Sequence, residues 1–387
     1  QPPLVAIYTG HGFDRQTQDL AFSNDCGRTW TKYVGNPVID RDEVDFRDPK
    51  VFWHTPTARW VMVVALAVQK KLLFYVSRDL KHWESSGEFG PAGVTTKANW
   101  ECPDLFELPI ENEPGESRWV LEADMGNGSV AGGSGGEYFI GEFDGATFLA
   151  DESSSQWVDW GRDFYAPVSW DGVPATDGRR IWIGWLNNWE TCLTPTFPFR
   201  GAMSIPRELV LRRIEGRLRL CQRPVRELED LRRAVTTVVD LTLDDEARVL
   251  EPTGKQLEIL AEFEPGSAES FGLRVLSDGV HRTEIIYDVA SGQIAVDRTR
   301  SGNVEFDSRF PGKHAGPLGL SEAGTIKLRI FVDACSVELF GGDGETVITD
   351  LVFPTDAADR VEVFATGGTC RLVNLQVHQL DSIWKRD

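Results

Sequence analysis

Short runs of apolar or alternating residues recur along the chain and predict an all-β fold. In the first 215 residues these runs lie at 4–9, 49–54, 60–67, 72–77, 118–124, 137–143, 180–186 and 208–214. Clusters of Gly, Asp, Asn and Pro separate them, as is expected between strands. Long stretches with the 3.6-residue period of a helix are missing. We expect one short helix, at 224–233.

A turn motif recurs between these runs. The segment SNDCGRTW at 23–30 is echoed by SRDLKHW at 77–83, and FIGEFDGATF at 139–148 is a weaker third copy. A period near 50 residues is typical of the four-stranded blades of a β-propeller. We expect the Asp and Gly to shape turns and the Trp or Phe to fill the space between blades. These residues are therefore predicted to be structural rather than catalytic.

The pattern changes after residue 220. Alternating strands are predicted at 255–264, 282–289, 325–333 and 336–342. Such a series is typical of an antiparallel β-sandwich. The fold class that follows is a β-propeller of about four blades over residues 1–220, a linker at 221–234 and a β-sandwich over 235–387.

The net charge limits the classes of molecule that this protein is expected to bind. Sixty acidic residues against 40 Lys and Arg give a net charge of −20. This surface repels phosphate backbones and anionic membranes, whereas a neutral sugar is compatible with it. The chain has no apolar run of 18 residues, and its six Cys form no C-x-x-C pair. We therefore predict isolated, buried thiols and neither a metal site nor a cofactor.

Two carboxylates have a context that suits catalysis. Glu101 lies between Trp100 and Cys102, and partial desolvation there would raise its pKa and suit it to donate a proton. A loop glutamate without a role is an equal alternative from this context alone. Asp48 is flanked by Arg47 and Lys50, which should keep it ionised. It could then bind sugar hydroxyls and oppose an oxocarbenium-like charge, although a turn aspartate is the plainer interpretation.

Five motifs in order give the chain a resemblance to a known family. They are FRDPK at 46–50, WECPDLF at 100–106, DFYA at 163–166, IGWLNNW at 183–189 and FRGAMSIPREL at 199–209. In this order and spacing they resemble glycoside hydrolase family 32, which includes invertases, levanases and exo-inulinases. The resemblance continues through RTRSGNVEF, FPGKHAGPL and FVDACSVELF, at 298–306, 310–318 and 331–340.

The resemblance implies a five-bladed propeller followed by a sandwich, and a retaining mechanism with three acidic residues. It implies that Glu101 is the acid/base and Asp48 the transition-state stabiliser. Arg47 would bind fructose hydroxyls, and Cys102 would tune Glu101. The sugar pocket would be lined by Asp163 and Tyr165, with Trp185 or Trp189 as an aromatic wall. The implied partner is a fructose-containing oligo- or polysaccharide such as inulin, levan or sucrose.

One part of the family pattern is missing from the sequence. The family's nucleophile is the aspartate of a tryptophan-methionine-asparagine-aspartate-proline motif in the first blade, and this motif does not occur here. The pair Asn24-Asp25 belongs to the turn repeat instead. We expect the first blade to be absent and residues 1–387 to be inactive, or nearly so, alone.

Two other functions fit parts of the sequence. The turn repeat resembles the Asp-box of sialidases, and a non-catalytic sugar-binding propeller would need no nucleophile. The sequence leaves open the choice among sucrose, inulin and levan, endo or exo action, and hydrolysis or transfer. It also leaves open the oligomeric state and the localisation, for which an extracellular site is slightly favoured.

Overall fold

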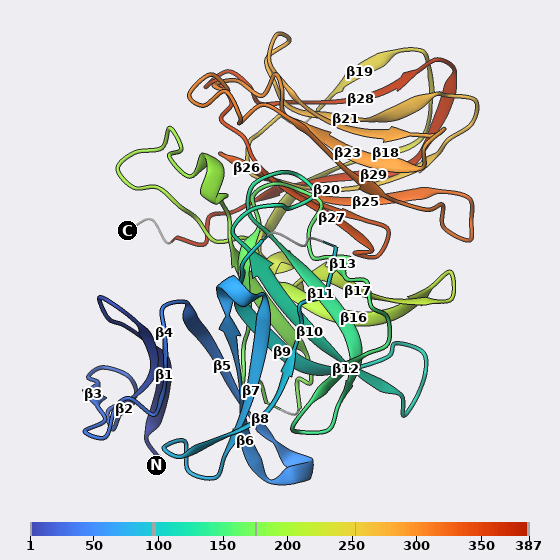
Figure 1. Ribbon diagram of the computed structural model, residues 1–387. Coiled ribbons are helices and arrows are strands. Elements are labelled where there is room, and N and C mark those ends of the chain that lie inside the picture. Colours follow the sequence, from blue (N-terminus) through green and yellow to red (C-terminus); the bar gives the residue numbers. More distant parts are fainter. Residues whose placement is uncertain (1, 95–97, 175, 252, 385–387) are drawn as a thin grey trace. The chain divides into compact units, whose positions relative to one another are not determined.

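The computed structural model describes residues 2–94, 98–174, 176–251 and 253–384, and it is almost entirely β-structure (Figure 1). Its helices are single short 3₁₀ segments: η1 (Thr55–Thr57), η2 (Ala67–Gln69), η3 (Trp189–Thr191) and η4 (Arg226–Leu231). Among the described residues no helix has the length and apolarity needed to cross a membrane. The helix expected at 224–233 corresponds to η4.

The chain divides into two units by its internal contacts. Unit 1 comprises Gln1–Ser129, Ser134–Val158 and Ala166–Gly178, and unit 2 comprises Val130–Gly133, Asp159–Tyr165 and Arg179–Asp387. The strand β14 (Tyr165–Ser169) lies where the chain passes from one unit to the other. The two units are described separately.

Unit 1 contains three antiparallel sheets of the kind that forms propeller blades. The first is made of β1 (Leu4–His11), β2 (Gln16–Ser23), β3 (Thr31–Lys32) and β4 (Ile39–Glu43). The second runs β5 (Phe46–His54), β6 (Arg59–Leu66), β7 (Lys71–Ser77), β8 (Trp83–Phe89). The third contains β9 (Trp100–Pro109), β10 (Ser117–Met125), β11 (Gly135–Phe143), β12 (Phe148–Ala150) and β13 (Gln156–Trp157).

The second and third sheets share a buried core. Alternate residues of β6 and β7, such as Val63 and Phe74, pack with Trp100, Leu121 and Phe139 from the third sheet. Because side chains alternate between the faces of a strand, this packing fixes which residues of β9 and β10 face the other way. The sites of interest lie on that other face.

The repeated motif makes turns, as predicted. In the first copy the Ser23 hydroxyl accepts the N–H of Gly27 at 2.8 Å, and Asp25 accepts the N–H of Thr29 at 2.8 Å. Phe148 of the third copy is buried in the core shared by the second and third sheets, as expected. Trp30 departs from this expectation, because it is 47% exposed. Its indole N–H donates to the carbonyl of Gly27 at 3.0 Å, so the ring folds back onto its own turn.

Unit 2 begins with a short antiparallel sheet and continues as a sandwich. The short sheet contains β15 (Arg180–Trp185), β16 (Arg207–Ile214) and β17 (Arg217–Pro224). One six-stranded sheet runs β18 (Arg232–Asp244), β29 (Thr369–Leu380), β20 (Leu257–Glu264), β25 (Ile326–Asp333), β26 (Ser336–Gly341), β27 (Thr346–Leu351). The other runs β19 (Ala247–Leu250), β28 (Arg360–Thr366), β21 (Ser270–Ser277), β22 (Thr283–Asp288), β23 (Gln293–Asp297), β24 (Lys313–Pro317).

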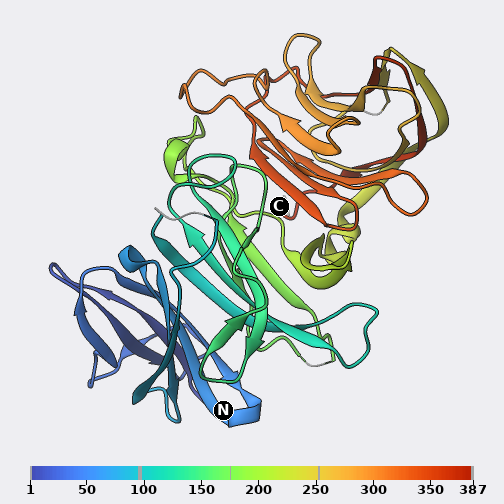
Figure 2. The same ribbon diagram turned by 45° about the vertical axis from the view of Figure 1, so that its right-hand side comes forward.

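The two six-stranded sheets lie face to face, as Figure 2 shows from a second direction. Their inner faces form one large apolar core that includes Ile259, Phe271, Ile330 and Leu375. The strands predicted from alternation at 255–264, 282–289, 325–333 and 336–342 are confirmed as β20, β22, β25 and β26.

Two smaller expectations are refined by the structure. Strands β17 and β18 occupy both ends of the segment 221–234, so only residues 225–231 of the expected linker lie outside strands. All six Cys are free thiols, and Cys221 and Cys370 are buried as predicted. Cys26 is exposed instead, because it lies in the first surface turn of the repeat.

Candidate active site

Four predicted site residues come together on two neighbouring strands of unit 1. Arg47 and Asp48 lie near the start of β5, and Glu101 and Cys102 lie at the start of β9. Each motif therefore opens a strand whose continuation is anchored in the apolar core. The side chains of the four residues are held by rigid sheet backbone rather than by a long loop.

The backbone is irregular at both motifs. The pairing of β5 with β6 shifts between Arg47 and Lys50, which marks a bulge. Asp48 has φ 65° and Cys102 has φ 45°, a left-handed conformation that non-glycine residues adopt at a cost. Bulges redirect side chains and are common beside active sites. Local strain at both motifs is therefore consistent with a functional site.

The guanidinium of Arg47 links the two candidate carboxylates. Its Nη2 donates to Oε1 of Glu101 at 2.8 Å, and its Nε lies 3.9 Å from Oδ2 of Asp48. Nη1 donates to Asp45 at 2.6 Å. The side chains of Arg47, Asp48 and Glu101 are 18%, 29% and 22% exposed. They form a half-buried cluster that still reaches solvent.

Asp48 is also held by the backbone of the second motif. Its Oδ2 accepts the N–H of Cys102 at 3.0 Å. Burial raises the pKa of Asp48, while the Cys102 N–H and the Arg47 charge oppose the rise. The flanking cations were expected to hold this group ionised, and the structure shows that burial is the larger influence.

Lys50 has a different partner from the one expected. Its ammonium lies 3.4 Å from Oδ1 of Asp104 and donates to the carbonyl of Ser169. The backbone N–H of Ser169 donates to Asp104 at 2.7 Å. The bulge at Asp48 separates Lys50 from it, so Arg47 is the cation that faces Asp48.

The surroundings of Glu101 differ from those predicted. Trp100 points into the core, where its indole stacks on Phe89 and its N–H donates to Oε1 of Glu137 at 2.8 Å. Neighbouring residues of a strand face opposite sides, so Trp100 cannot cover the carboxylate of Glu101. The guanidinium of Arg47 contacts this carboxylate instead.

The thiol of Cys102 is poorly suited to act as a nucleophile. Burial raises its pKa strongly, and the carboxylates of Asp124 and Asp48 add to the effect. The thiolate is the reactive form, so a raised pKa keeps the group inert. In the structure both the backbone N–H and the thiol of Cys102 donate to Oδ2 of Asp48, at 3.0 Å and 3.7 Å.

The aromatic residues predicted for the sugar pocket cluster in unit 2. The ring centroids of Trp185 and Trp189 are 5.0 Å apart, and those of Tyr165 and Trp185 are 6.3 Å apart. Trp189 is 56% exposed, whereas Tyr165 is 3% exposed. The two indoles form one joint aromatic surface, and Trp189 is its accessible part.

Asp163 is fully buried in unit 2. Its Oδ2 forms an ion pair with Arg298 and accepts the N–H of Leu351 at 2.8 Å. Both side chains of the pair are 0% exposed. This burial does not support the sugar contact expected of Asp163, and we leave it out of the proposed site.

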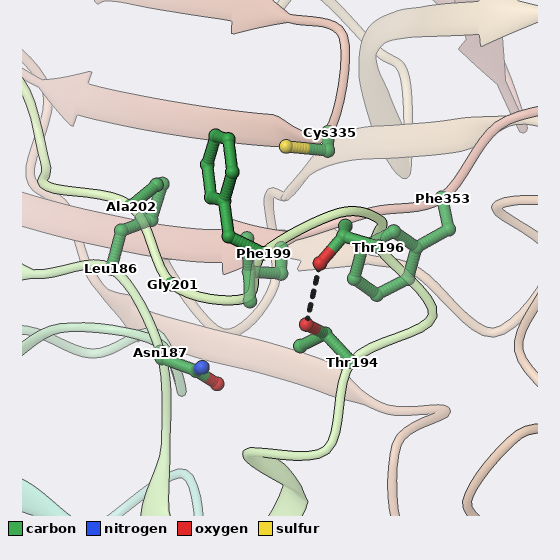
Figure 3. Close-up of a pocket in the computed structure, with 10 residues that line it drawn as sticks. Leu186, Asn187, Thr194, Thr196, Phe199, Gly201, Ala202, Cys335 and Phe353 are labelled. Carbon is green, nitrogen blue, oxygen red and sulfur yellow. Dashed lines mark hydrogen bonds between the residues drawn. The ribbon is translucent and has the colours of Figure 1, made fainter.

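Unit 2 also has a small cavity of about 110 Å³ (Figure 3). Its lining contains no charged side chain, and its polar groups include Thr194 and Thr196, whose hydroxyls lie 3.0 Å apart. Among the described residues no group of three or more His, Cys, Asp or Glu could hold a metal ion. The cavity therefore lacks the groups needed for acid–base or metal chemistry.

Comparison with known proteins decides the family. Residues 1–224 match the glycosyl hydrolases family 32 N-terminal domain, and residues 227–379 match the family 32 C-terminal domain. The chain belongs to glycoside hydrolase family 32. This membership confirms the family suggested by the five motifs, and it favours neither the sialidase nor the non-catalytic alternative.

Relatives in family 32 cover nearly all of the chain. A levanase of Bacillus subtilis is 44% identical over 393 residues, which are 99% of this chain but 58% of the levanase. An extracellular exo-inulinase of Aspergillus awamori is 37% identical, covering 99% of this chain and 77% of the relative. The chain thus spans little more than half of that levanase.

Solved structures of family 32 proteins confirm the fold. The crystal structure of exo-inulinase from Aspergillus awamori superposes with a TM-score of 0.93 at 36% identity, covering 99% of this chain and 80% of that one. A β-fructofuranosidase of Schwanniomyces occidentalis, complexed with fructosyl-erythritol, gives 0.89 at 30% identity, with coverage of 98% and 78%. The predicted fold class, a propeller followed by a sandwich, is confirmed.

Sequence reasoning missed two acidic residues near the family 32 motifs. Glu122 and Asp124 lie on β10, beside β9, and both are 0% exposed. The signal was present in SRWVLEADM at 117–125, where two acids two positions apart interrupt an apolar strand. Such alternation places both on one face of the sheet.

Proposed function

We propose that this chain carries the acid/base part of a hydrolase that releases terminal β-D-fructofuranosyl residues from fructans or sucrose. The observation behind the proposal is the guanidinium of Arg47 held between the carboxylates of Glu101 and Asp48. Membership of family 32 and relatives named levanase and exo-inulinase support the substrate class.

Glu101 is the proposed proton donor. In a retaining mechanism it protonates the glycosidic oxygen as the bond to the anomeric carbon breaks. After the leaving group departs, the same carboxylate takes a proton from water. Its half-buried position suits this work, since the carboxylate is fixed by Arg47 yet reaches solvent.

Asp48 is the proposed stabiliser of the charged transition state. The Cys102 N–H occupies Oδ2, which leaves Oδ1 to accept a sugar hydroxyl. A fixed carboxylate beside the fructosyl ring opposes the positive charge that develops on it. The nearby guanidinium of Arg47 has further N–H groups and can bind a hydroxyl as well.

The covalent step needs a third carboxylate, and the family's nucleophile motif is not found in residues 1–387. In retaining enzymes the nucleophile sits about 5–5.5 Å from the acid. We therefore propose roles for two of three acidic groups and expect residues 1–387 alone to turn over slowly or not at all. Trp189 is the proposed aromatic surface for the substrate, because it is exposed.

The test compares two forms of the protein. One is residues 1–387, and the other is the same chain preceded by a first-blade segment that carries the family motif. Fructose release from sucrose, inulin and levan is measured for each form, with the variants Glu101→Gln and Asp48→Asn. Glu142→Gln is the matched control, since Glu142 is an exposed carboxylate on β11.

The extended form should release fructose, and Glu101→Gln should slow it by about 10²–10⁴-fold on natural substrates. The loss should be smaller on an aryl fructoside, whose leaving group needs no proton. A Glu101→Gln variant with the full rate on sucrose and levan would rule out the acid/base role. Ordinary turnover by residues 1–387 alone would show that the missing motif is not required.

A further inference from the structure

The surroundings of Glu101 hold more carboxyl groups than cations. Five acidic side chains gather on β5, β9 and β10: Asp48, Glu101, Asp104, Glu122 and Asp124. Two cations pair with three of them. Arg47 contacts Asp48 and Glu101, and Lys50 lies 3.4 Å from Asp104.

Glu122 and Asp124 are the two that remain. Both are 0% exposed, and within the described ranges no ion pair reaches either of them. All four of their carboxyl oxygens are buried, and no side chain among those residues donates to them; the backbone N–H of Ala166 lies close enough to Asp124 to act on its pKa. A buried carboxylate in this condition is costly, so the pair must lower its charge by holding a proton.

The two carboxyl groups face the same point. A Cβ placed on Gly136 would lie 2.8 Å from Oε1 of Glu122 and 2.9 Å from Oδ1 of Asp124. The two oxygens are therefore no further apart than the sum of those distances. Two carboxyl groups this close cannot both be ionised cheaply in a dry site, and they titrate as a unit.

The pair lies on β10, the strand next to the one that carries the proposed acid/base. In the register of β9 and β10, Asp124 is opposite Glu101 and Glu122 is opposite Asp104. Paired residues of antiparallel strands project on the same face. The Asp124 carboxyl group thus faces Glu101 and Asp48, while Arg47 approaches Glu101 from β5.

We propose that Glu122 and Asp124 share one proton and keep one negative charge, and that this charge offsets Arg47 so that Glu101 can carry its proton. The proposal rests on the proposed role of Glu101. Arg47, placed 2.8 Å from Glu101, by itself favours the ionised carboxylate, which cannot donate. A buried negative charge on the other side reverses that bias. Glu122 and Asp124 are positioning residues, since they act through Glu101.

The electrostatic environment of the pair supports this assignment. Burial raises the pKa of Glu122 well above its ordinary value, and Asp124, Asp104 and Glu137 add to it. Burial likewise raises the pKa of Asp124, opposed by the N–H of Ala166 and reinforced by Glu101 and Asp48. The groups that face the pair are Asp48 of β5, Glu101, Cys102 and Asp104 of β9, and the Ala166 N–H. Glu137 of β11 acts on Glu122 from the opposite face of the sheet.

The test measures the protonation of each carboxyl group by NMR of residues 1–387, with ¹³C labels on the carboxyl carbons of Asp and Glu. Variants Glu122→Gln, Asp124→Asn and Glu101→Gln assign the signals, and Glu142→Gln is the control. One proton should stay on the pair through neutral pH. The double variant Glu122→Gln/Asp124→Asn removes the charge of the pair, and in it the titration of Glu101 should move about one to two pH units lower, as expected for the loss of one nearby charge.

Two results would overturn the proposal. If both carboxyl groups of the pair are ionised at neutral pH, or both protonated, no single charge exists to offset Arg47. If the pair holds one proton but the titration of Glu101 does not move in the double variant, the pair has no influence on it. The first result is measured in the unchanged protein, so the proposal can be refuted even if the double variant does not fold.

Activity adds a separate readout. In the extended form, the alkaline limb of kcat/KM should move to lower pH in the double variant Glu122→Gln/Asp124→Asn, while Glu142→Gln leaves it in place. If no form cleaves fructosides, the proposed function fails, yet the carboxyl signals still decide the protonation of the pair. The two conclusions are therefore distinguishable.

Discussion

Arg207 offers the sharpest test of how unit 2 is held together. It lies on β16 inside the family motif FRGAMSIPREL and is 0% exposed. Its guanidinium donates to Asp159 at 3.0 Å, to Glu338 at 2.8 Å and to Thr349 at 2.7 Å. One side chain thus connects the short sheet of unit 2 to the sandwich strands β26 and β27.

Replacing Arg207 by Met keeps an unbranched apolar stem and removes the guanidinium group with its charge. Two buried carboxylates, Asp159 and Glu338, then lose their cation. Breaking a buried pair in this way costs about 3–5 kcal/mol in the free energy of unfolding. With a guanidinium chloride slope of about 5 kcal/mol per M, the midpoint of unit 2 should fall by about 0.6–1 M.

The decrease in the free energy of unfolding caused by Arg207→Met should depend on pH. Burial already raises the pKa of Asp159 and of Glu338, although Arg207 opposes the rise. Without Arg207 both folded-state pKa values rise further. A raised folded pKa gives stability that is present below the unfolded pKa near 4 and is lost as pH rises. The cost of Arg207→Met should therefore be smaller near pH 4 than at pH 7.

The assay is guanidinium unfolding followed by tryptophan fluorescence at pH 4.5 and pH 7. Arg223→Met is the matched control, because Arg223 on the next strand pairs with Asp343, which is 52% exposed. An exposed pair is worth about 0–1 kcal/mol. If Arg207→Met unfolds within 0.5 kcal/mol of the unchanged protein, or no differently from the control, the reasoning about buried charge is wrong.

Three further outcomes are expected. Asp163→Asn should lower the unfolding midpoint, since it removes one of the two buried carboxylates, Asp163 and Asp350, that pair with Arg298; a normal midpoint with an altered KM would instead indicate a sugar contact. Lys70→Met should destabilise unit 1 by about 3 kcal/mol, because it removes the cation that pairs with the buried Glu137 and leaves neutral donors such as Trp100, and guanidinium denaturation measures this. Asp48→Asn should leave the unfolding midpoint within 1 kcal/mol while cutting fructose release from the extended form at least 100-fold, and an unchanged rate would exclude its proposed role.

The strands and turns could be predicted because their causes are local. Alternation within KQLEILAEFE specifies a strand whose inward residues are Leu257, Ile259 and Ala261. The Ser and Asp of the turn repeat bond to N–H groups two to four residues away. Such bonds are determined by spacing, so the sequence alone reveals them.

The environment of each site residue could not be predicted in the same way. The partner of Lys50 is Asp104, 54 positions away, and that of Arg207 includes Glu338, 131 positions away. The bulge at Asp48 decides which of two adjacent cations faces it, and a shift of one residue reverses the faces. Pairings of this kind depend on register between distant strands.

The family motifs combine two kinds of charged residue that look alike in sequence. Arg207 and Asp163 are fully buried with fixed ionic partners, whereas Glu101 and Asp48 keep more than a fifth of their side chains exposed. Only a group with access to solvent can exchange protons with a substrate. Exposure within an ion-paired cluster is therefore the physical criterion that separates the proposed catalytic carboxylates from those that stabilise the fold. By the same criterion the sealed pair Glu122 and Asp124 can influence the reaction only through its charge.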